Sequence, residues 1–243
     1  MKPKAGILLI IGGSRGIGAA TAQVCAPLFD QVVITYRQQR EAAEAVASQL
    51  DTPCTTFALD VADEAAVVEL FTAIDNLDGQ LTGLVNSAGI VAPATTAIHI
   101  DGQRLQTMFA TNVFGTFYCC REALKRMAPG GSIVNVGSAA SKHGSPEEYV
   151  DYAASKGAVD VLTLGLAKEA AAKNIRVNCV RPGIIDTDIH ADSGDRDRPR
   201  KLAPQVPLQR PGQADEVARA IAWLLSSESS YTTGSLIDVT GGR

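Results

Sequence analysis

The sequence contains few of the residues that build metal centres or disulfide frameworks. Its five cysteines are an odd number without a C-x-x-C pair: Cys25, Cys54, Cys119, Cys120 and Cys179. The three histidines are scattered and do not have metal-ligand spacing. These absences exclude a disulfide scaffold and predict no metal, with the thiols free in a reducing compartment.

Long hydrophobic runs and excess positive charge are missing as well. The apolar run over residues 5–11 is short and leads into GGSRGIG without a small-residue cleavage site, so we expect no signal peptide. No stretch reaches transmembrane length. The net charge of −4 is unlike the basic face of proteins that bind nucleic acids or membrane surfaces. We therefore expect a cytoplasmic protein without nucleic-acid or membrane partners.

Short apolar runs instead alternate with helical segments along all 243 residues. We predict strands at 7–11, 32–36, 55–59, 84–87, 133–137, 175–180 and 236–239, and helices at 16–28, 41–50, 65–75, 104–127, 152–173 and 215–226. Such alternation implies an α/β fold, with helices on both faces of a parallel sheet. No repeat or linker divides the chain, so residues 1–243 are expected to form a single domain.

A glycine-rich turn, IIGGSRGIG, joins the first predicted strand to the first helix. Gly12, Gly16 and Gly18 give the spacing G-x-x-x-G-x-G. Glycine tolerates positive φ in tight turns and lets a phosphate approach backbone N–H groups, and the N-terminal end of the helix attracts anions. A tight turn alone would also explain the glycines, but their place in a β-α-β unit favours dinucleotide binding.

The end of the second strand, ITYRQQR, indicates which dinucleotide the protein binds. An acidic residue there would bind the ribose hydroxyls of NAD, whereas arginine suits the 2′-phosphate of NADP. Asp30 lies at the strand's opposite end, and Arg37 follows the strand. Arg37 and Arg15 could bind one phosphate together. Either arginine alone is typical of a solvated surface; together they favour NADP(H) over NAD(H).

The stretch YVDYAASKG places Tyr152 and Lys156 on one helix face, four residues apart. A free tyrosine has a pKa of about 10. A nearby ammonium lowers that pKa and makes the phenol a better proton shuttle. This spacing also occurs in ordinary surface packing. Tyr149 lies seven residues before Lys156, so we expect it to line a pocket or to pack.

A serine follows the fifth strand in GSIVNVGSAAS. Ser138 stands at the carboxyl end of that strand, where open parallel sheets bind ligands. Its hydroxyl could bind a substrate oxygen or cap the local backbone.

Together these motifs resemble the short-chain dehydrogenase/reductase family over nearly the whole chain. IGGSRGIG resembles the pattern T-G-x-x-x-G-x-G, NSAG at 86–89 resembles N-N-A-G, and Tyr152 with Lys156 matches Y-x-x-x-K. Asn112 in TNVFG and the Pro182–Gly183 pair also match. The resemblance implies a Rossmann fold whose seven-stranded parallel sheet has the order 3-2-1-4-5-6-7.

The resemblance also implies a catalytic set of Asn112, Ser138, Tyr152 and Lys156. Tyr152 would exchange a proton with the substrate oxygen, Ser138 would hold that oxygen, Lys156 would bind the nicotinamide ribose, and Asn112 would hold a water. Cofactor contacts are implied at Gly12, Ser14, Arg15, Gly16, Ile17, Gly18, Arg37, Asp60, Val61, Asn86, Ala88, Gly89, Tyr152, Lys156, Pro182, Gly183, Ile185 and Thr187.

Three positions depart from the family pattern. Ile11 replaces a threonine whose hydroxyl usually ties neighbouring strands, so we expect an effect on stability. Ser87 replaces an asparagine. Ser138 and Tyr152 are one residue further apart than in the family pattern, which implies an insertion in HGSPEEYVD and leaves Ser141 as an alternative to Ser138.

The sequence thus predicts an NADP(H)-dependent oxidoreductase that interconverts a secondary alcohol and a ketone by hydride transfer. The alternatives are a non-catalytic NADP(H)-binding regulator and another Rossmann-type enzyme such as a methyltransferase; the latter does not explain Tyr152, Lys156 or Asn112. The irregular segment 191–201 lies in a predicted lid at about 188–211, and its cations could meet an anionic substrate or solvent. The family resemblance implies a homotetramer or homodimer that acts on a small molecule.

Overall fold

One parallel sheet organises the molecule. The computed structural model describes residues 6–243, so Ala5, where the first apolar run begins, lies outside the described residues. The strands are β1 (Ile7–Ile11), β2 (Gln31–Tyr36), β3 (Cys54–Ala58), β4 (Leu81–Asn86), β5 (Ser132–Val136), β6 (Arg176–Pro182) and β7 (Leu236–Val239). Their order, β3-β2-β1-β4-β5-β6-β7, confirms the predicted topology.

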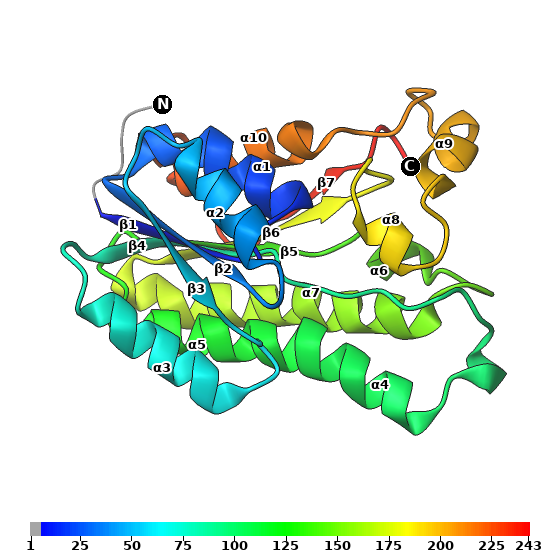
Figure 1. Ribbon diagram of the computed structural model, residues 1–243, viewed down its shortest axis with the longest axis horizontal. Coiled ribbons are helices and arrows are strands. Elements are labelled where there is room, and N and C mark those ends of the chain that lie inside the picture. Colours follow the sequence, from blue (N-terminus) through cyan, green and yellow to red (C-terminus); the bar gives the residue numbers. More distant parts are fainter. Residues whose placement is uncertain (1–5) are drawn as a thin grey trace.

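Helices cover both faces of the sheet (Figure 1). One layer contains α1 (Gly16–Cys25), α2 (Arg40–Ser48) and α10 (Ala214–Leu225), and the other contains α3 (Glu64–Asp75), α4 (Gly102–Phe109), α5 (Thr116–Arg126) and α7 (Val150–Ala170). The short helices α6 (Ala140–His143), α8 (Ile189–Asp192) and α9 (Arg198–Leu202) gather on the right in Figure 1. Single 3-10 turns are η1 (Ala26–Leu28), η2 (Ala97–His99), η4 (Ala171–Lys173), η5 (Ala203–Gln205) and η6 (Ser227–Ser229). Within residues 6–243, no helix could span a membrane.

The alternating side chains of β1 anchor two separate cores. Leu9 and its odd-numbered neighbours pack with Phe71 of α3 on one face, and Ile10 packs with Ile221 of α10 on the other. Every residue of β1 is buried. This explains the continuous apolar run in the sequence, since a parallel strand covered on both faces has no solvent side.

The predicted helical stretch over 104–127 is found at residues 102–126, but its middle is not α-helical. Between α4 and α5 the chain forms a π-helical segment, η3 (Ala110–Gly115), in which Asn112 is buried. Asn112 bonds the backbone of Ile90 through both its carboxamide atoms. Such segments cluster at functional sites, and apolar periodicity alone does not distinguish them from α-helix.

One further expectation needs correction. The segment 191–201 is not irregular throughout, because it contains the end of α8 and the start of α9, where Pro199 suits a first helical turn.

Beside Ile11, the Thr35 side chain of β2 accepts a hydrogen bond from Gly12 N at 3.0 Å. The expected effect of Ile11 on stability stays a prediction.

Gly18 fixes how closely α1 approaches the turn that follows β1. A Cβ built on Gly18 would lie 2.0 Å from the Gly12 carbonyl oxygen, which is backbone and cannot rotate away. A Cβ built on Gly102, at the start of α4, would instead point into open space. The same substitution at these two glycines therefore separates crowding from helix propensity.

We expect Gly18→Ala to lower the free energy of unfolding by at least about 2 kcal/mol, as overpacking in a rigid site does. Urea denaturation followed by circular dichroism measures the change. Gly102→Ala is the control and should leave the midpoint unchanged or raised. Equal midpoints for both variants would contradict the crowding argument.

Candidate active site

A cavity of about 620 Å³ opens where the loops leave the carboxyl ends of the strands. Most of the predicted cofactor contacts line it: Gly12, Ser14, Arg15, Gly16, Ile17, Arg37, Asp60, Val61, Ala88, Gly89, Tyr152, Lys156, Pro182, Gly183, Ile185 and Thr187. Ser138 lines it as well. Asn86, Gly18 and Asn112 are absent from its walls. The fold therefore brings one continuous set of predicted residues around one space.

The turn after β1 has the shape of an anion cradle. Gly12 and Gly16 have φ of +78° and +54°, values that L side chains rarely adopt. Arg15 precedes α1, and its side chain makes no hydrogen bond that caps the helix. The first N–H groups of α1 are thus left without a side-chain acceptor at the cavity wall. A dinucleotide pyrophosphate fits this turn.

Positive charge lies beside the cradle. Arg37 follows β2 and is exposed at the cavity, and Arg15 lines the cavity from the turn. Arg15 also pairs with Asp192 of α8, with both side chains well exposed. The two residues after Arg37 that line the cavity, Gln38 and Gln39, are neutral. This end of the site therefore presents guanidinium groups and no carboxylate at the end of β2.

Ser138, and not Ser141, lines the cavity together with Tyr152. The Ser138 hydroxyl accepts a hydrogen bond from Ala140 N at 3.1 Å and lowers the pKa of the Tyr152 phenol. The Ser141 hydroxyl donates to the Ser138 carbonyl at 2.8 Å. The loop between Ser138 and Tyr152 contains two non-glycine residues with positive φ, Ser145 and Glu147, and the extra residue expected in this loop stays a prediction.

Lys156 is buried behind Tyr152. Its Nζ donates to the Val136 carbonyl at 2.8 Å and lies 5.8 Å from the centre of the Tyr152 ring. Burial lowers the pKa of Lys156 to about 8, against opposing contributions from Cys179 and Asp160. The ammonium therefore loses its proton much closer to neutrality than an exposed lysine does.

The expected lowering of the Tyr152 pKa is not found in the protein alone. Burial raises the pKa of Tyr152, and the hydrogen bond from Ser138 only partly opposes this. The Lys156 ammonium is directed at the Val136 carbonyl and lies over the tyrosine ring. At neutral pH the phenol is consequently protonated.

Asn112 lies just beneath the cavity wall. Its Oδ1 accepts from Ile90 N at 2.8 Å, and its Nδ2 donates to the Ile90 carbonyl at 3.0 Å and to the Ser155 hydroxyl at 3.1 Å. A Cβ on Gly89 would lie 3.4 Å from both Asn112 Oδ1 and Lys156 Nζ. Asn112 and Lys156 thus flank the same glycine, although the predicted water between them stays a prediction.

Asn86 points away from the cavity. Its amide donates to Asn135 Oδ1 at 2.9 Å, across the β4–β5 pair, and to Cys120 Sγ at 3.2 Å. The Asn86 side-chain oxygen is buried and has no hydrogen-bond partner among residues 6–243, and the cofactor contact of Asn86 stays a prediction. Gly18 faces the Gly12 carbonyl, and its cofactor contact stays a prediction as well.

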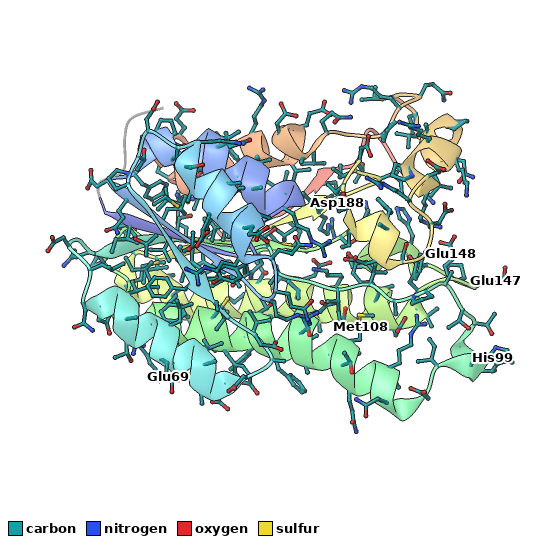
Figure 2. The ribbon with its side chains drawn as sticks, in the orientation of Figure 1. Glu69, His99, Met108, Glu147, Glu148 and Asp188 are labelled. Carbon is teal, nitrogen blue, oxygen red and sulfur yellow. The ribbon has the colours of Figure 1, made fainter. Side chains whose placement is uncertain are left out.

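The far end of the cavity contains Glu148, which the sequence did not assign to it. Arg198 of α9 forms a bidentate pair with Glu148, at 2.8 and 2.6 Å, and its guanidinium lies 5.0 Å from the Tyr149 ring centre. All three residues line the cavity, and Glu148 lies at the same end of the molecule as α8 (Figure 2). Tyr149 is thus a lining residue, and Arg198 is paired within the protein.

Comparisons with known proteins agree with this geometry. The family model described as Enoyl-(Acyl carrier protein) reductase matches residues 11–243. The uncharacterized oxidoreductase YgfF of Escherichia coli (strain K12) is 51% identical over 98% of this chain and 99% of its own. Human 3-oxoacyl-[acyl-carrier-protein] reductase is 37% identical over 97% of each chain.

A solved short-chain dehydrogenase/reductase from Serratia marcescens BCRC 10948 superposes with a TM-score of 0.91 at 31% identity, covering 98% of this chain and 97% of that one. These matches extend over the glycine turn and the serine, tyrosine and lysine of the cavity. The chain belongs to the short-chain dehydrogenase/reductase family of oxidoreductases, which act on CH–OH groups with NAD(P).

Proposed function

We propose that the protein is an NADP(H)-dependent oxidoreductase that interconverts a secondary alcohol and a ketone. The presence of Ser138 and Tyr152 together on the cavity wall, with Lys156 buried behind Tyr152, is the observation that carries this proposal. A protein that only bound the dinucleotide would not need a proton donor at that place. The whole chain, 1–243, acts as one domain in this proposal, and the segment at about 188–211 covers the substrate end.

The chain's own residues account for binding of the dinucleotide. The first turn of α1 holds the pyrophosphate, Arg15 and Arg37 hold the 2′-phosphate, and Asp60 and Val61 border the adenine. Pro182, Gly183, Ile185 and Thr187 line the nicotinamide end. When bound, the dinucleotide supplies or accepts the hydride at the substrate carbon.

Tyr152 and Ser138 handle the substrate oxygen. In reduction, the Tyr152 phenol donates its proton to the carbonyl oxygen while the Ser138 hydroxyl donates a hydrogen bond to the same atom. The raised pKa of Tyr152 keeps that proton in place at neutral pH. The Lys156 ammonium then stabilises the phenolate that forms, because opposite charges attract strongly in a buried site. In oxidation the proton moves the other way.

Exposed apolar side chains support self-association. Phe114 of η3 is 51% exposed and Phe117 of α5 is 45% exposed, and Val161 of α7 is 68% exposed. Large exposed apolar residues on neighbouring helices are typical of an interface. We infer a homotetramer or homodimer, located in the cytoplasm, with a small carbonyl compound or alcohol as substrate.

Arg37→Glu tests the choice of dinucleotide. We expect it to weaken NADPH binding by about 10- to 100-fold, which is the loss of a charge-assisted phosphate contact, and to leave NADH binding almost unchanged. Titration of cofactor fluorescence measures both constants. Arg40→Glu is the control, since Arg40 pairs with Glu44 and does not line the cavity. Tighter binding of NADH than of NADPH by the unaltered protein would reject the NADP(H) assignment.

Tyr152→Phe tests the chemistry. NADPH oxidation at about 340 nm, with ketones, sugars and oxoacyl thioesters as substrates, should fall by about 10²- to 10⁴-fold while NADPH affinity is retained. The panel follows relatives named 3-oxoacyl-[acyl-carrier-protein] reductase and glucose and ribitol dehydrogenase. Tyr149→Phe, which leaves Tyr152 and Ser138 unchanged, should retain most of the rate. If no carbonyl is reduced despite tight NADPH binding, the non-catalytic regulator becomes the better description.

The pH dependence of carbonyl reduction tests the role of the Lys156 charge. Burial lowers its pKa to about 8, so the ammonium is present below that pH and is lost as the pH rises through it. We expect kcat/KM for carbonyl reduction, measured from about pH 6 to about pH 10, to decline above about pH 8, because the phenolate loses its stabilising charge. A profile that stays flat to the alkaline end would mean that the charge of Lys156 does not contribute.

A further inference from the structure

A line of alternating charges leads from the surface to Lys156. Lys142 of α6 binds Asp238 of β7 at 2.8 Å, and Asp238 binds Arg181 Nε at 2.6 Å. Arg181, on β6, then reaches Asp160 of α7 at 3.4 Å. The Lys142 side chain is 45% exposed, whereas that of Asp160 is only 10% exposed. The charges therefore pass from water into the protein interior.

The side chains of Asp160 and Lys156 both approach the peptide group that joins Val136 to Gly137. The Lys156 ammonium donates to the Val136 carbonyl, and the Asp160 carboxylate lies so close to the next residue that a Cβ on Gly137 would be 3.1 Å from Asp160 Oδ1. Both side chains come from α7, one turn apart. Because both are buried, their attraction is weakly screened by water.

The other titratable groups around this pair are neutral at neutral pH. The Cys179 thiol of β6 donates to Asp160 at 3.6 Å, and burial raises its pKa to about 12. The Tyr152 phenol keeps its proton because burial raises its pKa. On β5, Val136 and Gly137 bring no charged side chain. Cys179 can therefore add to the stabilisation of the Lys156 ammonium only where its thiol ionises. At neutral pH, Asp160 is the anion and Arg181 the second cation that act on Lys156.

The geometry of Arg181 decides how much of the Asp160 charge remains available. Its Nε bond to Asp238 is short, whereas its Nη1 contact with Asp160 is at the limit of a hydrogen bond. Arg181 is thus mainly satisfied by Asp238. The Asp160 carboxylate is left partly uncompensated on the side of Lys156.

We propose that Asp160 is a positioning residue that keeps Lys156 in its charged form, and that Arg181, shared with Asp238, sets the strength of this effect. The proposal rests on the proposed function in one respect, namely that the ammonium of Lys156 assists proton transfer by Tyr152. Lys156 is the only member of the charge line on the cavity wall, so the others act through it.

Because the charges alternate along the line, substitutions at successive positions should shift the titration midpoint of Lys156 in alternating directions. Asp160→Asn should move the Lys156 titration midpoint down by about one pH unit, because the ammonium loses its anion. Arg181→Gln should move it up by about half a unit, because Asp160 is then less compensated. Asp238→Asn should move it down by a few tenths of a unit, about the size expected when Arg181 turns more fully to Asp160.

The midpoint is measured directly by NMR titration of the ligand-free protein with ¹³C-labelled lysine, the Lys156 signal being assigned with Lys156→Arg. Glu169→Gln, an exposed acid-to-amide change on the same helix, is the control and should leave the midpoint in place. An unmoved midpoint in Asp160→Asn, or shifts of the same sign in Asp160→Asn and Arg181→Gln, would overturn the proposal, because loosened packing moves both alike. If Asp160→Asn does not fold, Arg181→Gln and Asp238→Asn must still shift in opposite directions.

The alkaline limb of NADPH-dependent carbonyl reduction should move with the NMR midpoint in each variant. This second readout separates the two proposals. Midpoints that alternate as expected in a protein that reduces no carbonyl would retain the charge line and reject the proposed function. If the variants are active but neither the Lys156 midpoint nor the alkaline limb of the pH–rate profile moves, the proposed function would stand and the charge line would be rejected.

Discussion

The parallel direction of the strands is the constraint on which the site depends. Every loop that follows a strand leaves the sheet at the same edge, so the glycine turn after β1, the arginine after β2 and the serine after β5 open onto one cavity. The two helical layers bury both faces of the sheet and keep this edge fixed (Figure 1). A site assembled from segments far apart in the sequence is thereby held on rigid strand ends.

Within that frame, the burial of Lys156 governs the chemistry. Removing an ammonium from water is costly, and the protein offsets this with the Val136 carbonyl and the nearby Asp160 carboxylate. The result is a cation that sits close to its titration point and beside a protonated tyrosine. Small changes in the surrounding charges therefore change the fraction of Lys156 that is protonated near neutral pH.

The family resemblance implied the sheet order that the structure shows. The glycine turn and the positions of Tyr152, Lys156 and Ser138 on the cavity wall could be predicted from the sequence, because they depend on local pattern and strand direction. The sequence did not predict the π-helical turn at Asn112, since that turn is set by bonds to Ile90. The Arg198–Glu148 pair was missed for the same reason, as its partners are 50 residues apart and meet only in the fold. The raised pKa of Tyr152 in the protein alone was not predicted, because it comes from burial, which depends on tertiary packing.

The second strand, and not only the glycines, fixes the position of the turn after β1. The Thr35 hydroxyl accepts from Gly12 N at 3.0 Å, and the Thr35 carbonyl accepts from Gly13 N at 2.9 Å. One buried residue of β2 therefore holds two consecutive amides of the glycine turn. The loop proposed to receive the dinucleotide is in this sense an extension of the sheet.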